Sequence, residues 1–223
     1  MLRRVIGLVL GLGGFAVLVS LGIWQLQRLD WKLGIIAAIE ARIDEAPVPM
    51  PASPEAARDA YLPVTAEGSY TGEAVMVLSS DPQRGHGVQV IAVLATPDGR
   101  RLLVDRGYIP EAGRAGLVLA ADDVTVTGNL LWPDDADSYT PPPDLGRGLW
   151  FSRNVEPIAE HLGAEPVLIV ARSDAAQPGL TPRPITPAVR NDHLGYAITW
   201  FLLAAVWAVM TLALLWRNRQ QTT

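Results

Sequence analysis

Two long uncharged stretches near the two ends limit what this chain can fold into more than any other feature. Residues 5–26 form a run of 22 without a charged side chain, and residues 194–216 form a run of 23. Because an α-helix rises ~1.5 Å per residue, each run is long enough to cross a hydrocarbon core of roughly 30 Å. The sequence therefore predicts one transmembrane helix over residues 1–28 and another over residues 191–216.

The basic residues beside these runs predict their orientation. Arg3 and Arg4 precede the first run, and Arg217 and Arg219 lie in the tail 217–223 after the second. By the positive-inside rule both termini are then cytoplasmic, and the segment between the helices lies outside. Since only four residues precede the first run, an Arg-rich mitochondrial transit peptide has no room. We therefore expect the bacterial inner (cytoplasmic) membrane, with a periplasmic central domain.

A cleaved signal peptide is the alternative interpretation of the first run. However, the run is longer than the ~7–15 residues of the apolar region in such a peptide. It also ends in Trp24 and Arg28, which are typical anchors at a membrane interface. A retained signal anchor is therefore favoured.

The charge balance and the missing motifs exclude several classes of function. The chain has 18 Lys+Arg against 23 Asp+Glu, so it lacks the basic excess that nucleic-acid binding requires. Without cysteine it can form neither a disulfide scaffold nor a thiolate metal site. It also contains no P-loop, H-E-x-x-H or G-x-S-x-G pattern. We expect neither nucleic-acid binding nor an enzyme. A hydrolase built on the central domain is the alternative, although the sequence offers no recognisable pair of nucleophile and base.

Small residues recur at helical spacing in the first run. They are Gly7, Gly11 and Gly14. The stretch from Gly11 also matches the G-x-G-x-x-A pattern of dinucleotide sites, but that pattern requires a preceding strand. A face of small residues instead favours close helix contact, either with a partner helix or with the small residues of the second run. The latter are Ala204, Ala205 and Ala208.

The segment between the two runs is typical of a β-rich domain. The helical pattern continues over residues 29–46, and three prolines within residues 47–51 then impose an extended linker into a domain over residues 47–190. Six short stretches rich in Val, Ile and Thr follow, separated by Gly, Pro and Asp. They are residues 62–70, 74–79, 88–96, 101–108, 124–132 and 166–172.

Two local signals complete this prediction. Asp-Gly within residues 97–100 suits a tight hairpin turn. Residues 155–162 form an amphipathic pattern, with Asn154 as the expected N-cap and Gly163 as the C-cap. The predicted fold class is a membrane α-helical hairpin carrying a β-rich α+β domain, built as an antiparallel sheet or a small, partly closed barrel.

A histidine and several aromatic residues share one side of the second predicted helix. His193 is followed by Tyr196, Trp200 and Trp207, which are 3, 7 and 14 residues further on. An imidazole beside flat aromatic rings is suited to holding a porphyrin, with His193 as the axial ligand of the haem iron. The alternative is an ordinary aromatic belt at a membrane interface.

Basic residues are expected at the same interface. They are Arg28, Lys32 and Arg190. In the porphyrin interpretation these side chains pair with the two propionates, whereas flanking Arg and Lys are also common membrane anchors.

Other polar residues carry weaker signals. We expect His86 in a flexible surface loop and His161 at the surface or the core edge of the amphipathic helix. Asp134, Asp135 and Asp137 lack the spacing of a calcium loop, so a solvated acidic turn is favoured over a cation site.

Several motifs occur in a fixed order along the chain. They are residues 21–28 (LGIWQLQR) followed by Trp31 and Lys32, the proline linker, Gly68, residues 104–110 (VDRGYIP), residues 163–166 (GAEP) and residues 191–200 (NDHLGYAITW). Together these motifs resemble the Surfeit locus protein 1 family of cytochrome c oxidase assembly factors. The resemblance covers nearly the whole chain. One departure is the absence of an aromatic residue after Gly87.

The resemblance implies a protein without enzymatic activity that binds haem a transiently and assists its insertion into subunit I of cytochrome c oxidase. It implies His193 as the haem ligand, places the family's tryptophan at Trp200, and matches Tyr196 to a position where the family is intolerant of change. Our hypothesis adds that Tyr196 and Trp200 flank the ring and that haem A synthase is a further partner. An assembly scaffold that stabilises subunit I intermediates without binding haem remains the alternative. Gly68 matches a position where the family is intolerant of change, and a strand glycine there predicts a structural role.

Overall fold

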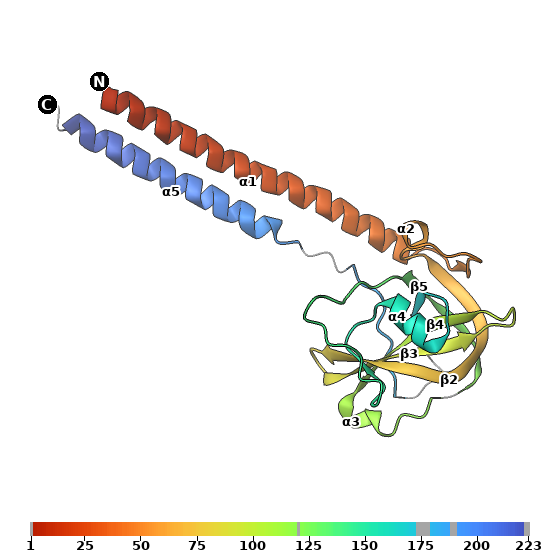
Figure 1. The fold of residues 1–223 in the computed structure, drawn as a ribbon. Coiled ribbons are helices and arrows are strands. Elements are labelled where there is room, and N and C mark those ends of the chain that lie inside the picture. The colour runs from red at the N-terminus through yellow and green to blue at the C-terminus, as the bar shows by residue number, and fades with distance from the viewer. Residues whose placement is uncertain (1, 120, 173–178, 188–190, 221–223) are drawn as a thin grey trace. The chain divides into compact units, whose positions relative to one another are not determined.

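The structure is a computed structural model that describes residues 2–119, 121–172, 179–187 and 191–220. The chain divides into two compact units, one formed by residues 1–38 and 187–223 and the other by residues 39–186. The first unit holds the two long helices and the second holds the sheet (Figure 1).

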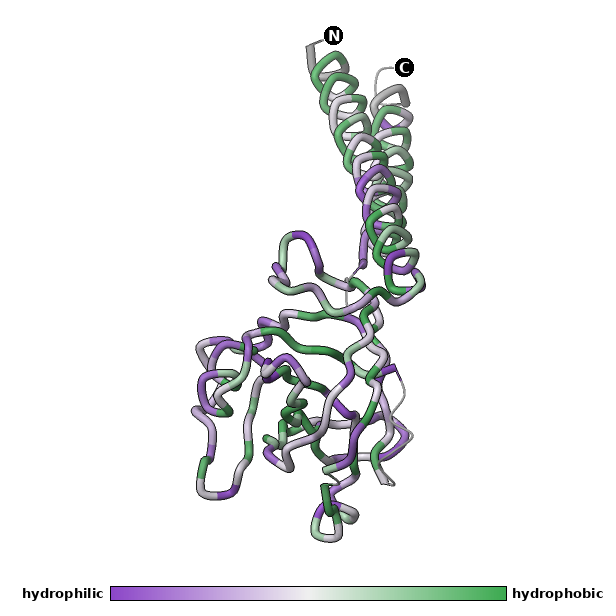
Figure 2. The backbone as a smooth tube through the Cα atoms, turned by 90° about the vertical axis from the view of Figure 1, so that its right-hand side faces the viewer, coloured by the Kyte–Doolittle hydropathy of each residue, from purple (hydrophilic) through white to green (hydrophobic). Residues whose placement is uncertain are grey.

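The two expected apolar helices are present. Helix α1 spans Leu2–Ile43 without a break, so the predicted membrane helix and the helical pattern after it form one element. Helix α5 spans His193–Gln220. Both are long and apolar enough to cross a membrane, and Figure 2 shows their predominantly hydrophobic character. Large apolar side chains such as Leu10 and Val209 are exposed on them.

The second unit contains seven strands and three short helices within the described residues. The strands are β1 Val48–Pro49, β2 Pro63–Asp81, β3 Gly85–Ala95, β4 Arg101–Pro110, β5 Asp123–Leu131, β6 Leu149–Trp150 and β7 Leu168–Ala171. The helices are α2 Ala56–Asp59, α3 Glu111–Arg114 and α4 Val155–Leu162. The hairpin turn predicted at residues 97–100 joins β3 to β4, and its Gly99 has a φ of 85°.

The strands form one mixed sheet in the order β1-β2-β3-β4-β7-β5, with β6 also paired to β2. The pairs β2–β3, β3–β4, β2–β5 and β5–β7 are antiparallel. The pairs β1–β2, β2–β6 and β4–β7 are parallel. The β-rich domain is thus confirmed, and the three parallel pairs depart from a purely antiparallel sheet.

Strand β2 is longer than the sequence indicates, because it joins the two predicted strands 62–70 and 74–79. Its first half pairs with β5, and its second half pairs with β3. The register shifts between Tyr70 and Ala74, around Gly72 with a φ of 83°. Such a bulge bends a strand and increases its twist, so β2 can leave one neighbour for another. The path of paired strands therefore returns to β2.

The core lies on both faces of the central strands. Leu102 and Val104 of β4 belong to one apolar cluster, whereas Leu103 between them belongs to another. Alternate side chains of a strand point to opposite faces, so both faces of β4 are covered. Ile158 of α4 lies fully buried in the second cluster, which explains why this short amphipathic helix is stable.

Helix α4 has the predicted bounds, but its N-terminus is organised differently. Gly163 adopts the left-handed conformation at the C-cap, as expected. Asn154 occupies the N-cap position without a side-chain cap bond. Its Oδ1 instead accepts hydrogen bonds from the backbone N–H groups of Asp135 and Ala136. Expecting a capping side chain there was wrong, because the neighbouring loop competes for the same oxygen.

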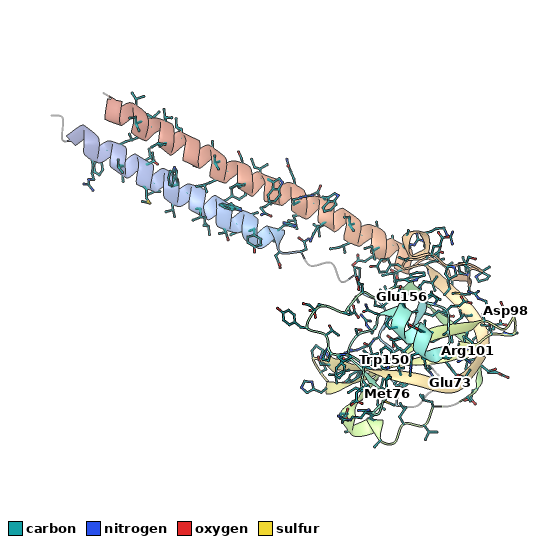
Figure 3. All side chains as sticks on the ribbon, viewed as in Figure 1. Glu73, Met76, Asp98, Arg101, Trp150 and Glu156 are labelled. Atoms are coloured by element: carbon teal, nitrogen blue, oxygen red, sulfur yellow. The ribbon has the colours of Figure 1, made fainter. Side chains whose placement is uncertain are left out.

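Arg101 supports the other end of α4. It donates hydrogen bonds to the carbonyl oxygens of Leu162 and Gly163, at 2.8 and 2.9 Å. It also forms an ion pair of 2.6 Å with Glu73 (Figure 3). Cations stabilise the C-terminal carbonyls of a helix, so Arg101 of β4 fastens α4 to the sheet.

The proline-rich linker is partly structured. Residues Val48–Pro49 form β1, which pairs with the start of β2, and Met50 N–H donates to the carbonyl of Thr65. Proline is compatible with this position because β1 lies at the end of the strand order and needs few donors. The extended geometry expected for the linker is therefore found at these residues, which also pair with the sheet.

Asp105 of β4 is a buried carboxyl group. It accepts hydrogen bonds from Gln89 Nε2 at 2.8 Å and from Gly107 N–H at 3.0 Å. Burial raises the pKa of Asp105 from its ordinary value of 3.8 to about 6, although these bonds and the charges of Arg153 and Arg183 oppose the rise. Above pH 6 the folded domain therefore holds a buried charge.

The variant Asp105→Asn is expected to alter how stability depends on pH. Between pH 4 and pH 6 the unfolded carboxyl ionises while the folded one stays protonated, so in the wild type Asp105 lowers the free energy of unfolding as pH rises. The decrease is on the order of 3 kcal/mol and is complete above pH 6. An asparagine side chain cannot ionise and escapes this decrease. The free energy of unfolding of the variant, measured by denaturant titration, should therefore rise relative to that of wild type between pH 4 and pH 7.

A matched control is Asp137→Asn on an exposed loop, which is expected to show no such gain. The pKa of Asp137 is lowered, chiefly by the backbone hydrogen bond from Tyr139. Its contribution to the free energy of unfolding is therefore fully present above pH 4 and does not change between pH 4 and pH 7. Parallel pH profiles for wild type and Asp105→Asn would contradict the assignment.

Gly68 is expected to tolerate no larger side chain. A Cβ atom there would overlap the carbonyl oxygen of Ala95, a backbone atom that cannot move away cheaply. We expect Gly68→Ala to lower the free energy of unfolding by about 1–3 kcal/mol. Gly116→Ala is the control, because its Cβ would meet no atom closer than 3.8 Å. Equal denaturation midpoints for the two variants would refute the steric explanation.

Candidate functional site

The two long helices pack against each other along one continuous seam. They run antiparallel and side by side (Figure 1). The seam residues recur at intervals of three and four, which is the spacing of helices packed at a small angle. On α1 they are Gly7, Gly11, Gly14, Leu18, Gly22 and Gln25, and on α5 they are His193, Ala197, Trp200, Ala204, Ala208, Thr211 and Leu215. Phe201 and Trp207 of α5 lie beside these residues and contact Gly22 and Gly14.

The glycines of α1 allow this close contact, which confirms the predicted role of the small-residue face. A Cβ on Gly14 would lie 2.5 Å from Trp207 Cε2, and one on Gly11 would overlap Thr211. The prediction that alanines of α5 face these glycines was incomplete. Ala204 is buried in the seam and Ala205 is exposed, but the side chains that lie over the glycines are other residues of α5. They are Thr211 over Gly11, Trp207 over Gly14 and Phe201 over Gly22.

His193 forms a hydrogen bond across the seam, at the end where α5 begins. Its Nδ1 lies 2.7 Å from Oε1 of Gln25, and Gln25 is only 9 % exposed. An amide oxygen can only accept, so Nδ1 donates its proton in this hydrogen bond, and in the neutral imidazole Nε2 then holds a lone pair. Ring nitrogens that bind metals characteristically have this arrangement, with the other N–H donated to a neighbouring acceptor.

The aromatic stripe predicted on α5 divides into two groups. Trp200 is half-buried in the seam, on the side of His193. Tyr196 is 58 % exposed, so its ring is open to a ligand. Trp207 donates its indole N–H to the carbonyl of Gly11 at 3.0 Å and contacts Gly14. It therefore belongs to helix packing and not to the group around His193.

The predicted basic residues of α1 lie close to Gln25 in the sequence. Arg28 follows within one turn, and its guanidinium carbon lies 5.9 and 5.0 Å from the ring centroids of Trp24 and Trp31. Stacking uses the flat face of the guanidinium and keeps its N–H donors available at the edge. Lys32 is half-buried and lies two turns after Gln25, on the same side of α1. Arg190 lies outside the described residues.

Gln25 is the site residue that sequence reasoning missed. The signal was an uncharged polar side chain inside an apolar run, where polar groups are costly unless they are used. A second polar atom at this end is Asn191 Oδ1, which is buried and has no hydrogen-bond donor among the described residues.

The remaining candidate residues lie in the second unit. His86 is exposed but belongs to strand β3, opposite Ser80, so placing it in a flexible loop was wrong. Its strand pairs because β2 continues as far as Asp81. His161 is exposed on α4, with its ring 5.5 Å from that of Trp150, as expected for the core edge.

The three aspartates of the acidic turn bind neighbouring groups of the protein. Asp134 accepts a hydrogen bond from Asn154, and Asp135 pairs with Arg153 at 2.7 Å. Asp137 accepts from the backbone of Tyr139. Across the described part of the chain, no three His, Asp or Glu side chains gather as a metal site would require.

The residues near this end of the seam are suited to ligand binding. The imidazole of His193 is bonded to Gln25, the exposed ring of Tyr196 lies one turn along α5, and the cations Arg28 and Lys32 follow Gln25 by one and two turns along α1. These groups match an iron atom, a flat macrocycle and carboxylates respectively. Because His193 is bonded to an amide instead of a carboxylate or hydroxyl, nothing here resembles a nucleophile and its base.

Comparison with known proteins gives one consistent result. The model of the SURF1 family matches residues 12–205. "Surfeit locus protein 1" of Rattus norvegicus is 30% identical over 213 residues, which cover 83% of this chain and 68% of the relative. The Homo sapiens protein of that name is 30% identical, covering 83% and 70%. A "SURF1-like protein" of Monosiga brevicollis is 30% identical, covering 86% and 80%.

The seam predicts that valine substitutions at two adjacent glycines have different effects on the separation of α1 and α5. Gly14→Val is expected to push α5 away, because its Cβ would meet the Trp207 ring. Gly13→Val is the matched control, since no atom lies within 4 Å of its Cβ. The chain lacks cysteine, so spin labels on cysteines introduced at the exposed Val9 and Leu212 report the helix separation. The distance distribution should lengthen or broaden for Gly14→Val only, and equal distributions would contradict the described seam.

Proposed function

The chain belongs to the SURF1 family, and from this premise we propose that it binds haem a between its two apolar helices and assists haem insertion into subunit I of cytochrome c oxidase. The observation that carries the proposal is the hydrogen bond from His193 Nδ1 to the buried Gln25. It directs the Nδ1 proton to the amide oxygen, so Nε2 is the ring nitrogen left to bind iron.

The surroundings of His193 support a porphyrin as the cargo. Tyr196 exposes its ring one turn from His193, and Trp200 lies two turns away on the same side. Aromatic rings and an apolar environment favour the flat, largely apolar macrocycle. We propose that Tyr196 and Trp200 contact the faces and edge of the haem and that His193 is the ligand of its iron.

The cations near the end of the seam support binding of the propionates. Arg28 and Lys32 follow Gln25 on α1 by one and two turns. Charge-assisted bonds from these side chains neutralise carboxylates that would otherwise resist transfer out of water. Arg190 completes the proposed set, although it lies outside the described residues.

The two helices support a membrane location. Their apolar side chains are exposed all round except along the seam, and such surface is compatible with lipid. Arg217 follows the apolar part of α5. We propose that both termini are cytoplasmic, that the sheet domain is periplasmic, and that the membrane is the bacterial inner membrane.

In this proposal the sheet domain contacts proteins and catalyses no reaction. Its exposed surface includes the apolar side chains of Leu78, Tyr139 and Leu145. Exposed apolar side chains are enriched where proteins meet. Subunit I is the proposed partner for delivery, and haem A synthase is the proposed source of haem a.

The proposal predicts a His193-dependent haem a spectrum. The protein is purified in detergent from cells that make haem A and measured by absorption and pyridine haemochrome. Wild type should contain haem a, and His193→Ala should lose most of it because the iron loses its ligand. His86→Ala, which alters an exposed histidine of β3, is the control and should retain haem.

Two outcomes would change the assignment. Equal haem content in wild type and His193→Ala would remove His193 as the ligand. Colourless protein from cells that contain haem A would favour the assembly scaffold that stabilises subunit I without haem. The closely packed glycine seam is the feature that such a scaffold would use.

A further inference from the structure

We propose that Gln25 is a positioning residue that sets both the tautomer and the ligand strength of His193. The inference rests on the haem binding proposed above, but its first part concerns the protein without haem. Gln25 touches no cargo in this proposal. It acts through the imidazole, by accepting the Nδ1 proton at 2.7 Å.

The burial of Gln25 is the first argument. Its side chain is 9 % exposed in a seam that otherwise consists of small and apolar residues at this end, such as Gly22 and Ala197. An amide buried without hydrogen bonds costs a few kcal/mol, and a leucine would fill the same space without that cost. The amide is therefore explained by what it bonds, which is His193.

The direction of the hydrogen bond is the second argument. A neutral imidazole exists in two tautomers, and in water the form with the proton on Nε2 predominates. The Gln25 oxygen reverses this preference because it can only accept, so the proton stays on Nδ1. Nε2, on the opposite edge of the ring, then presents its lone pair without any proton having to leave.

The neutrality of Gln25 is the third argument. A carboxylate at this position would draw the Nδ1 proton towards itself, make the imidazole more basic and strengthen the bond to iron. It would also place a charge in the apolar seam. An amide orients the ring while leaving it an ordinary neutral ligand. Such a ligand suits a cargo that has to be released again.

A purely structural role is the competing explanation, in which Gln25 only links α1 to α5. Polar pairs between helices in apolar surroundings do stabilise association modestly. That role predicts a change in helix pairing and no change in tautomer or in the properties of bound haem. The two explanations therefore differ in measurable quantities other than stability.

The tautomer is tested first in protein free of haem. ¹⁵N NMR of histidine-labelled protein in detergent is recorded in a His86→Gln, His161→Gln background, so that His193 is the single histidine. We expect an Nδ1–H pattern when Gln25 is present and a shift towards Nε2–H in Gln25→Leu. Gln27→Leu, on the exposed side of α1, is the control and should match the parent. An unchanged tautomer in the Gln25→Leu variant would overturn the inference.

Ligand strength is tested with haem a bound. Midpoint potential and the rate of haem transfer to excess apomyoglobin are measured for wild type, Gln25→Leu and Gln25→Glu. Gln25→Leu should release haem about tenfold faster, and Gln25→Glu should lower the potential and slow release. Unchanged potential and rate in both variants would overturn the inference, even if helix pairing weakens.

The two proposals fail in different ways. If wild type binds haem a through His193 but the Gln25 variants behave like it, only the role of Gln25 is refuted. If wild type binds no haem, the proposed function fails, while the NMR result still decides whether Gln25 sets the tautomer of His193.

Discussion

The close approach of α5 to the glycines of α1 is the interaction on which the site depends. Gly11, Gly14 and Gly22 each receive a side chain of α5 in the space that a Cβ would occupy. Without such contacts the two backbones could not come near enough for Gln25 and His193 to share a proton at 2.7 Å. The chemistry of a single histidine is thus determined by van der Waals packing along the remaining length of two helices.

In the sheet domain, the single strand β2 pairs with two different neighbours. One strand supplies partners to both β5 and β3, because a bulge redirects it between Tyr70 and Ala74. Gly68 lies just before that bend and allows close contact with the Ala95 carbonyl. The buried Asp105 follows on β4, held by Gln89 and Gly107. A polar group inside the sheet and a polar pair inside the helix seam are both stable because each is hydrogen-bonded.

Features with a strong periodic signal were predictable from sequence, and features that depend on distant partners were not. The apolar runs, the bounds of α4 and the turn at Gly99 follow from local patterns. The glycine at position 72 is typical of the end of a strand, but β2 continues past it because its second half pairs with β3. Asn154 has capping chemistry, but the adjacent loop takes its oxygen. Gln25 lies 168 residues from His193 along the chain, so only the packed helices reveal the bond between them.

The contacts along the seam also fix the register of α1 relative to α5. Gly14 lies opposite Trp207, Gly22 opposite Phe201, and Gln25 opposite His193. A slip of α1 by one turn, about 5.4 Å, would bring Leu29 or Gly22 to the level of His193. Neither residue has a side chain that can accept its proton. The hydrogen bond of this one imidazole therefore depends on the register of the two helices from Gly11 to Gln25, and the α5 side chains packed on the glycines maintain that register.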